Sequence, residues 1–179
     1  MVELNVAVRY VINNIMKFIK ESGFTLIELI VVIGIISIMA IAVLAVLDPS
    51  SQIKKANDAR RKADLSQIQK ALETYYQDNG NYPAVGSGYK LTDKSGTIVN
   101  WGSSWSPYMN VIPKDSTLSH TYVYYSPDRQ SYYLYANLER GIKDPQVCNG
   151  VLNCASVPAG VNCGGVVCNY GVSSVDVSP

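Results

Sequence analysis

Residues suited to catalysis are scarce in this sequence. Its 179 residues include one histidine, His120, and no match to the Gly-x-Ser-x-Gly, P-loop or dinucleotide-binding motifs. His120 stands at the edge of an expected strand, where a surface position is more common than a catalytic one. The formal net charge is only +1, so the whole molecule has no general attraction for nucleic acid. We predict that the chain is not an enzyme, and we expect no direct nucleic acid partner.

Charge is almost absent from residues 24–47. Among the 24 residues from Phe24 to Leu47, Glu28 is the one ionisable side chain. About 20 apolar residues cross the hydrocarbon core of a bilayer, and a helix inside a soluble protein is rarely apolar on every side for so long. The sequence therefore predicts a transmembrane helix over 24–47, followed by a more polar part of the chain.

Residues 1–23 have the composition of a leader peptide. Lys17 and Lys20 precede the apolar run, and positive charge before a first span keeps that end in the cytoplasm. Met16 is a possible true start of the chain. We expect a single-pass protein of the inner, cytoplasmic membrane with its C-terminal head outside.

An ordinary secretory signal is an alternative. Ala40-Ile41-Ala42 fits a small-residue cleavage site, and cleavage after Ala42 would release a secreted domain. Against this, the apolar run is longer than a usual signal core. A charge such as that of Glu28 also costs about 2.5–3.5 kcal/mol at mid-bilayer, and a plain signal has no use for it.

The segment Gly23-Phe24-Thr25-Leu26-Ile27-Glu28-Leu29 resembles the prepilin signature of type IV pilins and type II secretion pseudopilins. The resemblance combines a polar leader, a glycine, an aromatic residue, a glutamate and a long apolar run. It implies that a prepilin peptidase cuts between Gly23 and Phe24 and methylates the new N-terminus at Phe24. It also implies partners: copies of the chain in a helical filament, an inner-membrane assembly platform with its ATPase, and the lipid bilayer.

Glu28 has a candidate partner in the α-amine that cleavage would create at Phe24. The two residues are four apart and so share one helix face. Buried ion pairs add little net stability but can specify alignment, so a pair between neighbouring chains would set their axial register. The resemblance implies this assembly role. A glutamate that headgroups merely solvate is the alternative reading.

Residues 48–80 change from uniformly apolar to amphipathic. Asp48-Pro49-Ser50-Ser51 interrupts the run, Ser51 suits a helix cap, and Gly80 suits a helix end. The expected apolar face recurs at three- and four-residue steps. Its members are Ile53, Ala56, Ala63, Ile68, Ala71, Leu72, Tyr75 and Tyr76.

The start of this second helix is rich in positive charge. The cations are Lys54, Lys55, Arg60, Arg61 and Lys62. They suit an anionic partner, either lipid headgroups or an acidic patch on the next subunit, and they equally suit a solvated helix face.

Residues 81–145 predict a β-sheet head. Residues 121–125 and 131–138 are rich in aromatic and β-branched side chains, and Ser126-Pro127-Asp128 between them suits a turn, so we expect an antiparallel hairpin with one face on the second helix. Tyrosine suits a thin sheet whose other face is wet. Trp101 and Trp105 are expected at the edge of the core, with ligand stacking as an alternative.

Residues 146–179 form a cysteine-rich tail. Its cysteines are Cys148, Cys154, Cys163 and Cys168. An even count beyond a membrane segment predicts disulfides, and of three possible pairings the short loops favour Cys148–Cys154 and Cys163–Cys168. A zinc site is the rival, but neither spacing is Cys-x-x-Cys and no histidine is near.

The order of helix, loop and short antiparallel sheet is similar to that of major pseudopilins and related pilins, from residue 16 to about 140. The resemblance implies an α+β, type IV pilin-like fold. It also suggests a calcium site in a late loop, here residues 139–144, but the acidic residues are poorly spaced for calcium and we expect no cofactor.

The predicted function is a structural subunit of a type IV pilus or type II secretion pseudopilus. A single-span, membrane-anchored extracellular binding protein is the alternative.

Overall fold

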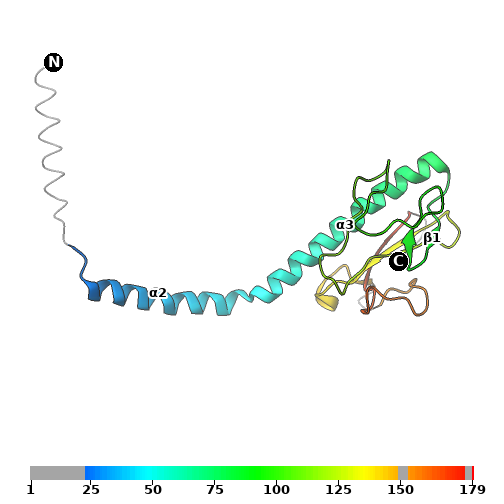
Figure 1. Ribbon diagram of the computed structural model, residues 1–179. Helices are drawn as coiled ribbons and strands as arrows, with labels where there is room; N and C mark the ends of the chain where they lie inside the picture. The colour runs from blue at the N-terminus through cyan, green and yellow to red at the C-terminus, as the bar shows by residue number, and fades with distance from the viewer. Residues whose placement is uncertain (1–22, 149–152, 176–178) are drawn as a thin grey trace, which may run out of the picture. The chain divides into compact units, whose positions relative to one another are not determined.

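The chain divides into two units, which are described separately. The computed structural model describes residues 23–148, 153–175 and 179, so the predicted leader lies outside these residues except for Gly23. The first unit ends at Asp48, and the second runs from Pro49 to Pro179. The described part of the first unit is a single helix, and the second holds the remaining helices and strands (Figure 1).

The apolar run forms helix α2, Leu26–Leu47. The helix ends at Asp48, whose backbone is left-handed with φ 39° and ψ 76°. Helix α3, Pro49–Asn79, begins with the next residue. Proline suits a first helical position because its missing N–H has no partner there in any helix. The predicted break is confirmed, but the prediction of Ser51 as the cap of the second helix is wrong, because Ser51 lies inside the first turn of α3.

Helix α3 ends where the sequence predicts. Gly80 has φ 68°, and its N–H donates to the carbonyl of Tyr76 at 2.7 Å. The buried face of α3 consists of Asp58, Arg61, Asp64, Leu65, Ile68, Ala71, Leu72 and Tyr75. Ile53 and Ala56, predicted on this face, are exposed because the head buries α3 only from Asp58 onward. Ala63, also predicted there, is exposed although its neighbours Arg61 and Asp64 are buried.

A three-stranded antiparallel sheet lies against α3. Its order is β3 (Val123–Tyr125), β4 (Tyr133–Ala136) and β5 (Tyr170–Ser173). The predicted hairpin is confirmed as β3 and β4, with Tyr124 opposite Leu134. Strand β5 was not predicted, and it pairs antiparallel with β4 along the whole length of both strands.

Shorter elements complete the head. Strands β1 (Val85–Gly86) and β2 (Lys90–Leu91) form a two-stranded sheet, and the 3₁₀ turn η1 (Gly141–Lys143) follows β4. Figure 1 shows α3 running along the head with the strands beside its C-terminal half.

Two cores lie on opposite faces of the three-stranded sheet. Successive strand residues point to opposite faces, so Tyr124 and Leu134 belong to the core under α3, whereas Val123 and Tyr135 belong to the other. The second core is completed by all four cysteines. The face expected to be wet is therefore covered by the cysteine-rich tail.

Both tryptophans belong to the core under α3. Trp105 is fully buried and stacks on Tyr75 with ring centroids 5.5 Å apart. Trp101 packs edge-on against Tyr122 at 5.8 Å. The predicted place at the edge of the core holds for the partly buried Trp101, whereas Trp105 lies inside the core.

Candidate assembly site

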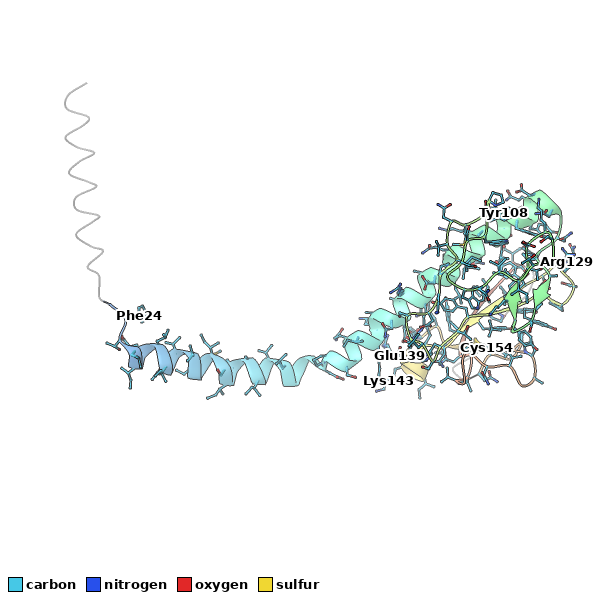
Figure 2. All side chains as sticks on the ribbon, viewed as in Figure 1. Phe24, Tyr108, Arg129, Glu139, Lys143 and Cys154 are labelled. Carbon is cyan, nitrogen blue, oxygen red and sulfur yellow. A yellow bond between two sulfur atoms is a disulfide. The ribbon has the colours of Figure 1, made fainter. Side chains whose placement is uncertain are left out.

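The predicted cleavage position lies immediately before helix α2. Thr25 is the N-cap of the helix, with an extended backbone. Phe24 is 81% exposed, and a Cβ built on Gly23 would meet no atom within 4 Å (Figure 2). The peptide bond between Gly23 and Phe24 is thus open to another molecule.

Glu28 takes part in a capping box with Thr25. The Glu28 Oε2 accepts from the Thr25 backbone N–H at 2.9 Å and from the Thr25 hydroxyl at 2.8 Å. In return, the Glu28 N–H donates to the Thr25 Oγ1 at 3.2 Å. This reciprocal arrangement satisfies amide groups that the first turn of a helix leaves without partners.

The sequence reasoning missed Thr25. The signal was present, because a threonine three residues before a glutamate and an apolar run is the local pattern of a capping box. The prepilin resemblance implies an intermolecular role for Glu28, whereas these bonds lie within its own helix.

Phe24 and Glu28 lie on one side of the chain. Together with Ile27, Val31 and Val32 they line one shallow, open hollow at the start of α2. The structure therefore brings the two predicted assembly residues together. The carboxylate of Glu28 stands at the rim of an apolar surface, where a cation from another molecule could approach it.

The rest of α2 has no partner within the described residues. Its segment from Leu26 to Leu44 is long and apolar enough to cross a membrane, and none of it is buried. Large apolar side chains are exposed on all sides of the helix, including Ile33, Ile36 and Met39. So large an apolar surface indicates contact with lipid or protein.

The N-terminal part of α3 joins the head through Arg61, which is 2% exposed. Its Nε is 2.7 Å from Asp115 Oδ2, its Nη1 is 3.1 Å from Asp58 Oδ1, and its Nη2 is 2.9 Å from Glu139 Oε1. The Asp58 carboxylate also accepts the backbone N–H groups of Glu139 and Arg140. One guanidinium and its acids thus tie α3 to two separate loops of the head.

The pKa values follow from these contacts. Burial alone would raise the pKa of Asp115, but the hydrogen bond from Arg61 and the N–H of Thr117 outweigh burial and hold that pKa below its ordinary value. Burial opposes the charged form of Arg61, yet its bonds to Asp115 and Glu139 raise the pKa of the guanidinium. Both groups are therefore charged throughout the physiological range.

A second ion pair joins Lys62 to the loop in which calcium was considered. Lys62 Nζ is 2.7 Å from Asp144 Oδ1, and burial of Asp144 is outweighed by this bond, so the pKa of the carboxyl is lowered. Glu139 pairs with Arg61, as above. Among the described residues, no three His, Cys, Asp or Glu side chains are grouped to hold a metal ion. Glu139 and Asp144 of this loop are thus paired with cations of α3, and the expectation of no cofactor stays a prediction.

The predicted cationic run of α3 is thus split in two. Arg61 and Lys62 are neutralised by acids of the head. The other three cations are exposed and have no hydrogen bond or ion pair with any described residue. They are Lys54, Lys55 and Arg60.

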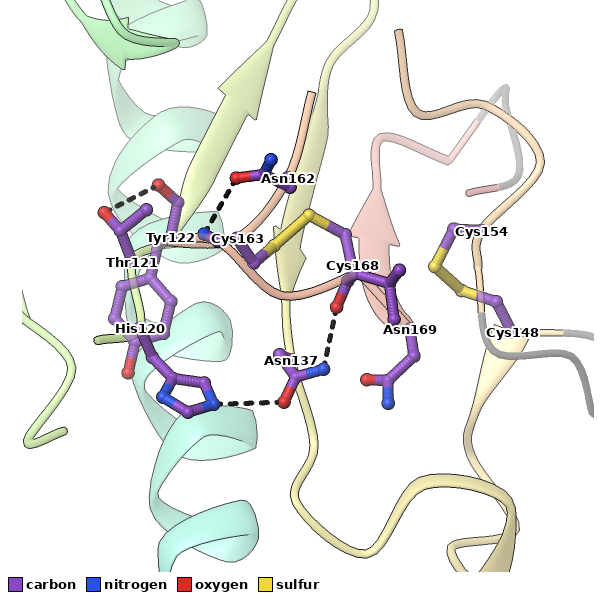
Figure 3. Close-up of a disulfide and its surroundings, with 12 residues drawn as sticks. His120, Thr121, Tyr122, Asn137, Cys148, Cys154, Asn162, Cys163, Cys168 and Asn169 are labelled. Atoms are coloured by element: carbon purple, nitrogen blue, oxygen red, sulfur yellow. Dashed lines mark hydrogen bonds between the residues drawn. A yellow bond between two sulfur atoms is a disulfide. The ribbon is translucent and has the colours of Figure 1, made fainter. Parts of the chain in front are cut away.

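The tail carries two disulfides, Cys148–Cys154 and Cys163–Cys168, which is the pairing that loop length favours. The cysteines of the first bridge bind the two residues that lead into β5: the Cys148 N–H donates to Asn169 O, and the Cys154 N–H donates to Cys168 O. Figure 3 shows Asn137 between His120 and the Cys163–Cys168 bridge. Its side-chain amide donates to the carbonyl of Val167, and its side-chain oxygen is hydrogen-bonded to the His120 ring. His120 is thus half-buried in a structural contact.

A long apolar helix, a second helix, small antiparallel sheets and paired C-terminal disulfides together define an α+β, pilin-like fold. Residues 49–143 match the family described as "Type II secretion system (T2SS), protein G", and residues 19–44 match the prokaryotic N-terminal methylation motif. The first match covers 95 residues, counted from 49 to 143, which is more than half of 179. The chain therefore belongs to the protein G family of pseudopilins. No similar chain was found among curated proteins or solved structures.

Family membership defines the general role. Protein G pseudopilins are structural subunits rather than a family of enzymes, and membership implies assembly into a filament with the secretion machinery. The methylation motif together with the apolar helix α2 indicates membrane anchoring.

Proposed function

We propose that this chain is a prepilin-type subunit of a type II secretion pseudopilus or type IV pilus. A prepilin peptidase cuts it between Gly23 and Phe24 and methylates the new amine of Phe24. The cut subunit waits in the inner membrane with α2 in the bilayer and its head outside. An assembly platform with its ATPase then adds it to a filament of identical copies.

One observation carries this proposal: α2 is apolar on every side and unburied, whereas the head buries its own core. Apolar surface of this extent is costly in water, so α2 needs lipid or other apolar helices around it. Lipid supplies that environment before assembly, and the α2 helices of neighbouring copies supply it afterwards.

Glu28 is suited to join two copies. Both of its capping bonds use Oε2, and no described residue bonds to Oε1. The methylated amine of Phe24 in a neighbouring copy could therefore bind Oε1 without breaking the cap. If one helix shifted along its neighbour, the carboxylate and the amine would each be buried without a partner, which is energetically costly. The pair would therefore fix the axial register of the filament.

The mass of the mature N-terminus is the direct test. We expect a chain that starts at methylated Phe24. An uncut chain that stays in the membrane would instead support an anchored binding protein, and a chain that starts at Val43 would support a secreted domain. Either result would overturn the proposal.

A pair of variants separates the charge of Glu28 from its capping role. Glu28→Gln removes the charge but keeps an amide oxygen that can complete the capping box. Thr25→Ala removes the cap and keeps the charge. We expect Glu28→Gln to insert in the membrane and form no filaments visible by electron microscopy, whereas Thr25→Ala still forms them.

The N-terminal mass of both variants controls for cleavage, since filaments need cut subunits. Normal filaments from correctly cut Glu28→Gln protein would show that the charge does not set the register.

A further inference from the structure

The first two turns of α3 stand apart from the head. Every residue from 49 to 56 is exposed, and Figure 1 shows this part of the helix clear of the strands and loops. The side chains here include Lys54, Lys55 and Ile53, which is 62% exposed. The segment follows directly on the apolar run, separated from it only by Asp48.

The charge of Lys54 and Lys55 is not balanced within the described chain. Neither forms a hydrogen bond or an ion pair there, whereas Arg61 and Lys62 on the same helix do. Asp58, the nearest acid on the C-terminal side, is enclosed with Arg61 and two backbone N–H groups. An anion that meets the two lysines must therefore come from outside the head.

Their distance from the apolar run suits a headgroup layer. At a rise of about 1.5 Å per residue, Lys54 and Lys55 lie about 8–9 Å along α3 from Pro49, and Arg60 lies about 17 Å from it. The polar layer on each side of a bilayer is about 5–8 Å thick. A lysine side chain can extend back toward that layer, so Lys54 and Lys55 are better placed along the chain to reach lipid phosphates than Arg60 is.

The positions around the helix also favour a lipid layer over a one-sided protein contact. Consecutive helical residues are about 100° apart, so Lys54 and Lys55 point in different directions with Ile53 beside them. A helix that passes through a headgroup layer meets phosphates on all sides. Exposed apolar side chains next to lysines are typical of helix segments at the membrane interface.

We propose that Lys54 and Lys55 bind the phosphates of anionic phospholipids while the subunit waits in the membrane. This inference rests on the proposed function, which places α2 in the bilayer. The contact would fix the depth of the head above the membrane and would be given up when the subunit enters the filament.

Lipid selectivity of the cut chain, which starts at Phe24 and so lacks Lys17 and Lys20, tests this directly in vesicles. The vesicles are phosphatidylcholine with a small fraction of spin-labelled phosphatidylglycerol or, in parallel, spin-labelled phosphatidylcholine, and electron spin resonance gives their relative association with the protein. We expect a preference for phosphatidylglycerol of up to about fivefold for each lysine at low salt, falling as salt is raised. Both leaflets have the same composition, so the orientation of the inserted chain does not matter.

Variants of Lys54, Lys55 and Arg60 show whether the lipid preference comes from the two lysines. Lys54→Gln with Lys55→Gln should abolish the preference, and Lys54→Arg with Lys55→Arg should keep it. Arg60→Gln, which removes one exposed charge from the same helix farther from the apolar run, should also keep it. All these side chains are exposed, and circular dichroism checks that the fold is unchanged.

Different results would contradict the lipid contact and the proposed function. An equal association with both lipids, or a preference that survives the double glutamine variant, would overturn the inference. An equal loss per charge removed in the double variant and in Arg60→Gln would do the same, since it would reflect net charge rather than position. If selectivity survives but the double variant forms no filaments, the lysines serve a second copy of the chain. If the chain does not float with vesicles at all, the proposed function fails as well.

Discussion

Helices α2 and α3 follow one another in the chain but differ in how many charged residues they contain and in where the partners of those residues lie. Helix α2 has 22 residues and one acid, none of its residues from Leu26 to Leu44 is buried, and its acid bonds to a threonine three residues away. Helix α3 has 31 residues and buries Asp58, Arg61 and Asp64, with partners 54 to 82 residues away in the sequence. The head satisfies its buried charges internally, whereas the apolar surface of α2 needs an environment that the described chain does not supply.

The difference shows where each half obtains its stability. A buried charge needs a fixed partner, so the ions of α3 require the head to be folded. An apolar helix needs only an apolar surrounding, and its backbone hydrogen bonds are satisfied within the helix. Damage to the head should therefore leave α2 in the membrane, and damage to the start of α2 should leave the head folded.

The largest effect is expected from Arg61→Met. It removes the cation from three acids, two of them fully buried, and breaking a buried ion network in this way costs about 3–5 kcal/mol. Urea unfolding of the full chain in detergent, followed by near-ultraviolet circular dichroism of the head, measures this loss. The neighbouring exposed residue gives the control: Arg60→Met should change stability by less than about 0.5 kcal/mol. Equal effects of the two variants would contradict the role of Arg61.

Replacing Cys163 and Cys168 by alanine should cost less. The disulfide closes a loop with a separation of five residues, for which chain entropy gives about 2 kcal/mol. We expect faster amide hydrogen exchange in β5, because the start of that strand is held by the disulfide loops. Exchange in α2 should not change. An unaltered urea midpoint would show that the bridge adds nothing to the stability of the head.

Acid should weaken the head by a smaller amount. The pKa values of Asp115 and Asp144 are lowered in the folded chain, since the bonds from Arg61 and Lys62 outweigh burial. The unfolded chain therefore binds protons first as pH falls, so this stabilisation is complete well above about pH 4 and is lost below it. Urea midpoints between pH 6 and pH 3 measure the loss. Asp115→Asn should be less stable than the native chain at pH 6, and the gap should narrow toward pH 3. A constant gap would contradict this account.

The smallest effect is expected from Thr25→Ala at the start of α2. Loss of the cap costs about 1 kcal/mol, which corresponds to about fivefold faster exchange of the first amides of the helix. Thr25→Ser should restore the slow exchange, because serine caps in the same way. The urea midpoint of the head should be unchanged in both variants. Equal exchange in the alanine and native chains would show that the cap is not formed.

The sequence predicted the elements that depend on near neighbours. A run of 24 residues with one charge has few alternatives to a helix, and α2 begins within two residues of the predicted start. The β3–β4 hairpin was also predictable, because two tyrosine-rich strands are joined by a short turn. Thr25 could have been found by the same kind of local rule.

What was missed depends on distant contacts. Strand β5 is four residues long and contains glycine, and its pairing with β4 is decided by the fold rather than by its own sequence. Arg61 was grouped with exposed cations because its acids lie in remote loops. Ile53 continues the helical apolar pattern beyond the point where the head covers α3, so periodicity alone placed it in the core.

The position of β5 near the end of the chain sets an order of events during biogenesis. Synthesis runs from the N-terminus, so α2 is complete long before Tyr170 exists, and the central strand β4 lacks its second neighbour until then. A subunit truncated before Tyr170 would keep a complete α2 helix but could not close its sheet. Closure of the three-stranded sheet therefore waits until Tyr170–Ser173 have been synthesised.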